Sequence, residues 1–103
     1  MNLEGQTALV TGGARGIGRA IASALAAGGA DVVILDLLDE EGQATARSLS
    51  DQHGRTVVFV RADISRDDEV GAAVDSGVQA VGAITTLVSN AGWKATGPAH
   101  VLD

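Results

Sequence analysis

The chain has 103 residues, which suits one small domain, and 46% of them are hydrophobic, so a core can form. Its net charge of −6, with only 7 scattered Lys and Arg residues, argues against nucleic acid or an anionic membrane surface as a partner. The lack of Cys excludes disulfides and thiolate metal sites, and no apolar run reaches the roughly 18–20 residues of a membrane span. The N-terminus does not resemble a signal peptide, so we expect a cytoplasmic protein.

Short apolar runs rich in β-branched residues alternate with longer helical patterns along the chain. The runs predict strands at Thr7–Val10, Val32–Leu35, Thr56–Val60 and Thr86–Ser89. The patterns between them predict helices at about Gly16–Ala27, Asp39–Gln52 and Asp67–Val81. Nearly continuous apolar strands are typical of a parallel sheet that is covered on both faces.

Local signals mark the ends of these helices. Gly28-Gly29 suits a left-handed end for the first helix, and Ser65 is a candidate N-cap for the third. Asp39-Glu40-Glu41 places negative charge at the positive end of the second helix dipole. Gly71 and Gly77 weaken the prediction of the third helix, because each costs about 1 kcal/mol relative to Ala.

Strand–helix alternation with right-handed crossovers predicts an α/β fold, a partial doubly wound layer structure made from residues 1–103. We expect four parallel strands in the order 3-2-1-4 with flanking helices, which places the switch point at the carboxyl ends of the first and fourth strands. The fourth strand would then be an edge, through which the chain can self-associate.

The stretch Thr11–Gly18 is the strongest functional signal, because it lies between a predicted strand and a predicted helix. A turn of this kind exposes backbone N–H groups at the positive end of a helix dipole, where a dinucleotide pyrophosphate commonly binds. A tight turn with no ligand is the alternative. The residues that we expect to contact the cofactor here are Gly12, Arg15, Gly16, Ile17 and Gly18.

Asp36 ends the second strand, eighteen residues after Gly18. A carboxylate there can accept hydrogen bonds from adenosine ribose hydroxyls and would repel the 2′-phosphate of NADP. Leu37 follows Asp36, so no cation comes next in the sequence to receive the 2′-phosphate. Arg15, beside the glycine turn, could still allow NADP to bind. The pattern favours NAD, with NADP less favoured; a solvated acidic residue at a strand end is the alternative.

Two further strand ends carry candidate residues. Asp63, after the third strand, could accept from an adenine amino group while Ile64 packs on the ring. Alternatively, it could form an Asx turn or mark the entry to a helix. Asn90, Ala91 and Gly92 follow the fourth strand, facing the glycine-rich turn, where small residues leave room for ribose and nicotinamide.

Other polar residues give no catalytic or metal site. His53 and His100 have no neighbours at ligand spacing, so both are expected at the surface and no metal site is predicted. Ser23 lies inside the first helix with no expected base partner.

Taken together, four motifs resemble the N-terminal, cofactor-binding half of short-chain dehydrogenases/reductases, including 3-oxoacyl-carrier-protein reductase-like members. The matching segments are Thr11–Gly18, Asp36, Ala62-Asp63-Ile64 and Ser89-Asn90-Ala91-Gly92. The resemblance implies a Rossmann sheet, NAD(H) or NADP(H), and reversible oxidation of an alcohol to a ketone. It also implies an adenine contact for Asp63, a cofactor-site role for Asn90 and an NAD-preferring pattern at Asp36. Ser89 departs mildly, since the family usually has a first Asn there.

The catalytic residues of that family, above all a Tyr-x-x-x-Lys, lie downstream of the matched region, and this chain contains no Tyr. No catalytic residue is therefore assigned, and Lys94 is on the wrong loop to substitute. We expect an NAD(P)-dependent oxidoreductase truncated before its catalytic half. A stand-alone or inactive dinucleotide-binding module is the alternative, and a methyltransferase-like site is a weaker one.

Overall fold

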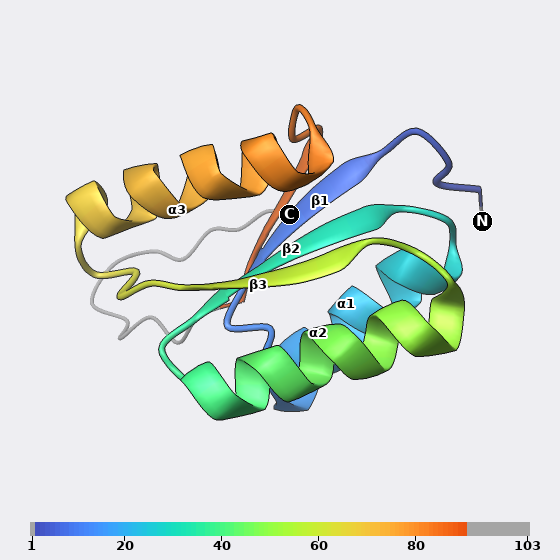
Figure 1. Ribbon diagram of the computed structural model, residues 1–103, viewed down its shortest axis with the longest axis horizontal. Helices are drawn as coiled ribbons and strands as arrows, with labels where there is room; N and C mark the ends of the chain where they lie inside the picture. The colour runs from blue at the N-terminus through green and yellow to red at the C-terminus, as the bar shows by residue number, and fades with distance from the viewer. Residues whose placement is uncertain (1, 91–103) are drawn as a thin grey trace.

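The computed structural model describes residues 2–90, which form a parallel sheet between two layers of helices (Figure 1). The elements in chain order are β1 (Thr7–Thr11), α1 (Gly16–Ala27), β2 (Asp31–Asp36), α2 (Asp39–His53), β3 (Val57–Arg61), α3 (Asp67–Val81) and β4 (Thr86–Ser89). The strand order is β3-β2-β1-β4, and each neighbouring pair is parallel. The predicted doubly wound fold and its strand order are confirmed, and the element bounds differ from prediction by a residue at most at either end.

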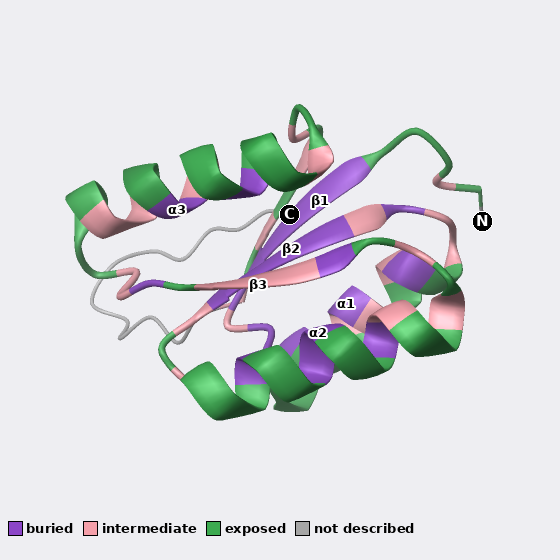
Figure 2. Ribbon diagram, viewed as in Figure 1, coloured by how far each residue is buried: buried purple, intermediate pink, exposed green. Residues whose placement is uncertain are grey.

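Helices α1 and α2 cover one face of the sheet and α3 covers the other, as Figure 1 shows. Side chains of the two central strands alternate between these layers, so each face has its own apolar cluster. On the α1–α2 face the cluster consists of Val10, Ala22, Ala26, Val32, Ile34, Ala46, Leu49 and Val57. On the α3 face it consists of Leu9, Val33, Leu35, Ala62 and Ala73. The centre of the sheet is therefore buried on both faces (Figure 2).

Coverage is incomplete at β4, which is an edge strand of the sheet as predicted. The strand alternates between half-buried and exposed residues, and the Leu87 side chain is 53% exposed. The reason is the position of α3, which packs against β2 and β3. It approaches β2 so closely that a Cβ on Gly77 would press on the Val33 side chain, which explains a glycine inside this helix.

The start of α3 also differs from prediction. Arg66, not Ser65, is the N-cap residue, and its side chain makes no capping hydrogen bond. The Ser65 hydroxyl donates instead to Asp63 Oδ1 at 2.6 Å, and the backbone N–H of Ser65 donates to the same oxygen at 3.0 Å. This local turn uses the hydroxyl group that a cap would need.

The end of α1 is closer to expectation. Gly28 keeps a right-handed φ of −78°, and Gly29 supplies the left-handed φ of +107°. Within residues 2–90, no helix is long and apolar enough to cross a membrane, and no group of three His, Cys, Asp or Glu side chains could hold a metal ion.

Candidate functional site

The glycine turn (Thr11–Gly18) leads from the carboxyl end of β1 into α1, as predicted. Gly16, the first residue of α1, has a left-handed φ of +64° with open space where a side chain would stand. The first turn of α1 contains no acidic residue, and Arg15 at the N-cap makes no side-chain capping bond. The positive end of this helix dipole is thus uncompensated by a capping side chain, which leaves its N–H groups suited to an external anion.

Close packing fixes the shape of the turn. A Cβ on Gly18 would overlap the carbonyl oxygen of Gly12 and the side-chain amide of Asn90. Asn90 donates from Nδ2 to that same carbonyl at 3.2 Å, and its backbone N–H donates to Thr11 Oγ1 at 3.0 Å. The end of β4 is therefore tied to the glycine turn, as expected for a switch point between β1 and β4. Ala91 and Gly92 lie outside the described residues.

Asp36 reaches the glycine turn from the end of β2. Its Oδ2 accepts a hydrogen bond from the Ala14 backbone N–H at 3.1 Å, and its Oδ1 accepts one from the Leu38 N–H at 3.2 Å. Each carboxylate oxygen still has acceptor capacity, because an ionised carboxylate offers about four lone-pair sites. The side chain is half-buried beside the turn rather than fully solvated at a strand end.

Thr45 on α2 is a site residue that the sequence reasoning missed. Its buried hydroxyl donates to the Ala14 carbonyl oxygen at 2.6 Å, so Ala14 is held through its N–H by Asp36 and through its C=O by Thr45. A polar residue on the buried face of a predicted helix was the signal that could have revealed it. The two bonds fix the glycine turn to both β2 and α2.

Arg15 is directed toward α2. Its Nη1 lies 3.5 Å from Glu41 Oε2 in the first turn of that helix, and both side chains are largely exposed. Ile17, on the first turn of α1, is 73% exposed. Both residues border the glycine turn on its solvent side.

Asp63 follows β3 and forms the Asx turn that the sequence left as one of its alternatives. Both bonds to its carboxylate, from the Ser65 N–H and hydroxyl, fall on Oδ1, so Oδ2 has no bonded partner among the described residues. The Ser65 hydroxyl, then its backbone N–H and the charges of Arg66 and Arg61, hold the pKa of Asp63 below its usual value. A charged carboxylate with one free oxygen is compatible with an adenine contact as well. Ile64 beside it is half-exposed.

Ser23 corrects a prediction, because it does have a base as partner. Its Oγ lies 3.0 Å from His53 Nε2, which joins α1 to α2 near the carboxyl ends of both helices. No acidic side chain bonds to His53 among residues 2–90, so no third group orients the imidazole for catalysis. The pair joins α1 to α2 and lies outside the glycine turn.

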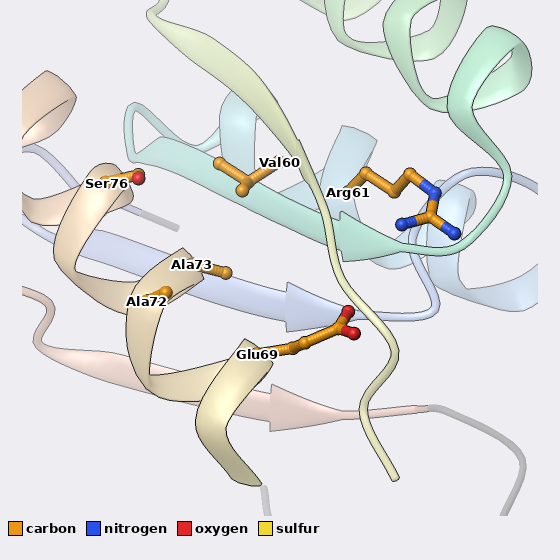
Figure 3. A pocket seen from close by; sticks show the side chains of 6 residues that line it. All are labelled: Val60, Arg61, Glu69, Ala72, Ala73 and Ser76. Atoms are coloured by element: carbon orange, nitrogen blue, oxygen red, sulfur yellow. The ribbon is translucent and has the colours of Figure 1, made fainter. Parts of the chain in front are cut away.

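A small hollow between β3 and α3 was not predicted. It measures about 180 Å³ and is lined by Val60, Arg61, Glu69, Ala72, Ala73 and Ser76 (Figure 3). Sites for small molecules typically occupy about 300–1,000 Å³, so this hollow is too small for a dinucleotide. It is separate from the glycine turn and lies on the α3 face of the sheet.

Comparison with known proteins decides the family. A family model described as short chain dehydrogenase matches residues 6–103. The chain belongs to the short-chain dehydrogenase family. Among curated relatives, it is 46% identical over 90 residues to the 3-oxoacyl-(acyl-carrier-protein) reductase FabG of Chlamydia trachomatis. It is also 46% identical over 90 residues to the 3-alpha-(or 20-beta)-hydroxysteroid dehydrogenase of Mycobacterium tuberculosis.

Each alignment covers 87% of this chain but only 36% and 33% of those two relatives, so the chain spans about a third of their length. Among solved structures, the L-sorbose reductase of Gluconobacter frateurii, complexed with NADPH and L-sorbose, superposes with a TM-score of 0.84 at 35% identity. That superposition covers 89% of this chain and 35% of the reductase chain. The short-chain dehydrogenase fold here thus corresponds to one part of such an enzyme.

The described residues fit a nicotinamide dinucleotide of the kind that short-chain dehydrogenases use. Gly16 leaves open space at the start of α1, the helix dipole there has no side-chain cap, and Asp36 presents a carboxylate beside it. Gly12, Gly18 and Asn90 are brought together around the same turn. Asp63 and Ile64 lie at the end of the neighbouring strand β3.

Proposed function

We propose that this chain is the cofactor-binding part of an NAD(P)-dependent oxidoreductase that interconverts an alcohol and a ketone. The observation that carries the proposal is the hydrogen bond from the Ala14 N–H to Asp36 Oδ2. This bond places an acceptor for ribose hydroxyls next to the uncapped end of α1, where a pyrophosphate is favoured. The relatives named as reductases and dehydrogenases support the reaction class.

Each candidate residue has a role in this proposal. Backbone N–H groups at Gly16, Ile17 and Gly18 would hold the pyrophosphate, because they begin α1 with no side-chain acceptor. Asp36 would accept from the adenosine ribose. The free Oδ2 of Asp63 would accept from the adenine amino group, with Ile64 packed on the ring.

The nicotinamide end lies on the β4 side of the turn in this proposal. Asn90, with Ala91 and Gly92, would border the ribose and ring, and Asn90 holds the Gly12 carbonyl in place for them. The bound nicotinamide supplies the hydride acceptor or donor. Transfer of the hydroxyl proton needs a general acid/base. These 103 residues include no Tyr, so we propose that this group comes from outside this sequence.

We propose NAD as the preferred cofactor. The Asp36 carboxylate would repel a 2′-phosphate, and Leu37 after it offers no compensating cation. The sorbose reductase, which is 35% identical to this chain, was solved with NADPH, and that likeness favours NADP instead. We give Asp36 more weight, because its contact with the glycine turn is a property of this chain.

Calorimetric titration of the purified chain with NADH and with NADPH tests the proposal. NADH should bind saturably, and Asp36→Ala should weaken it by roughly tenfold or more, since hydrogen bonds to a charged group are worth about 1.5–3 kcal/mol. Asp51→Ala, an exposed carboxylate near the far end of α2, is the matched control. A folded chain that binds neither cofactor would overturn the proposal.

The alternative function, a dinucleotide-binding module without catalysis, has one observation in its favour: the absence of Tyr. Measurable turnover of an alcohol by the purified chain would exclude it. A cytoplasmic location stays a prediction of the sequence.

We also propose that the chain self-associates through β4. This strand pairs only with β1 among the described strands, and its Leu87 side chain is 53% exposed. An unpaired strand edge with an apolar side chain is a template for pairing with another chain.

A further inference from the structure

The cation of the glycine turn is already paired. Arg15 is the only Lys or Arg within Thr11–Gly18, and its Nη1 lies 3.5 Å from Glu41 Oε2. The two side chains are 71% and 50% exposed, so the pair sits in solvent above the turn. Exposed pairs of this kind contribute little to stability, so an effect of this one is expected in binding.

The position of Arg15 links it to the adenosine end of the proposed cofactor. Arg15 follows Ala14 directly, and the Ala14 N–H is bonded to Asp36, the proposed ribose acceptor. A phosphate on the ribose 2′-oxygen would therefore lie beside the Asp36 carboxylate, with Arg15 as the one cation of the turn. Of the two, only Arg15 could receive it, since a guanidinium binds phosphate through a planar set of donors.

We infer that Glu41 is a specificity-determining residue, which discriminates against a 2′-phosphorylated dinucleotide by withholding Arg15 from it. Resting on the proposed function, this inference assigns the choice of cofactor to two carboxylates. Asp36 repels the extra phosphate directly, and Glu41 engages the one cation of the turn that could offset that repulsion. Removing Glu41 frees Arg15 and removes a negative charge at the same time.

A neighbouring residue separates these two consequences. Glu40 lies in the same acidic first turn of α2, is exposed, and forms no ion pair with Arg15. Glu40→Gln therefore changes the net charge near the site by the same amount without releasing the guanidinium. Any effect that Glu41→Gln has beyond that of Glu40→Gln reports the Arg15 contact.

The test is calorimetric titration of the full chain with NAD⁺ and NADP⁺ at low and moderate salt, for wild type, Glu41→Gln, Glu40→Gln and Arg15→Gln/Glu41→Gln. We expect Glu41→Gln to raise the ratio of NADP⁺ to NAD⁺ affinity by roughly two- to tenfold, as one exposed charge in water allows. Glu40→Gln should raise the ratio less, and the double variant should lose the gain.

Two results would overturn the inference while leaving the proposed function intact. In the first, NAD⁺ binds and Glu41→Gln does not change the ratio. In the second, Glu40→Gln raises the ratio as much as Glu41→Gln does, which would show a simple effect of net charge. If wild type binds neither nucleotide, the proposed function fails, and the inference fails with it.

Discussion

Replacing Thr45 by Val should remove the bond that anchors the glycine turn to α2 while nearly preserving the shape of the side chain. The Thr45 hydroxyl donates to the Ala14 carbonyl at 2.6 Å, and the two residues are 6% and 2% exposed. Water cannot replace the hydroxyl at such a site, so the carbonyl would stay buried without this partner. We expect the free energy of unfolding to fall by about 2 kcal/mol, within the range of about 1–3 kcal/mol for an unsatisfied buried group.

Urea unfolding followed by far-ultraviolet circular dichroism measures this loss of stability, because α1, α2 and α3 all contribute to the helical signal. For a domain of this size, a loss of that magnitude also lowers Tm by about 10 °C. Thr45→Ser, which keeps the hydroxyl, is the control and should retain most of the stability. A Thr45→Val chain whose unfolding free energy stays within about 0.5 kcal/mol of wild type would refute the reasoning.

Three further outcomes follow from the same structure. Gly18→Ala should destabilise the fold by about 1–3 kcal/mol and abolish NADH binding, because its Cβ would overlap the Gly12 carbonyl; urea unfolding and calorimetry check this. Ser65→Ala should raise the pKa of Asp63 toward its ordinary value, as an NMR titration of the carboxyl group would show. Because the folded state lowers this pKa, the charged Asp63 stabilises the wild-type fold at pH values above the pKa of the unfolded chain. That stabilisation is lost as the pH falls through the pKa of the folded chain, and Ser65→Ala should make the free energy of unfolding less dependent on pH in this range. Leu87→Lys should shift sedimentation toward the monomer if β4 mediates self-association, and an unchanged distribution of an associating wild type would contradict that role.

The layer structure could be predicted from the sequence because its signals are local and repeated. Apolar runs of strand length alternate with helical patterns, and right-handed crossovers leave few ways to arrange them. The same logic placed Asn90 opposite the glycine turn, since the carboxyl ends of parallel strands share one edge. Its contact with Gly12 confirms that placement.

The misses depend on particular contacts that residue propensity and periodicity do not describe. Ser65 has a side chain suited to an N-cap, but its hydroxyl donates a hydrogen bond to Asp63, two residues earlier, instead of capping α3. Thr45 and Ser23 bond to residues 31 and 30 positions away, which no helical pattern reveals. Gly77 weakened the prediction of α3 on propensity alone, whereas its contact with Val33 shows a helix packed too closely for a larger residue.

The contacts of Asn90 have a consequence for the order in which the molecule becomes competent to bind. Its partners, Thr11 and Gly12, precede it by 79 and 78 positions, and β1 acquires β4 as a neighbour over the same span. The β1–β2 and β2–β3 pairings close much shorter loops, so they form at lower entropic cost. During synthesis, three strands and three helices can therefore assemble before Asn90 reaches the glycine turn. The contacts of Asn90 with the turn form when β4 inserts beside β1, so pairing of these two strands also brings the residues of this edge together.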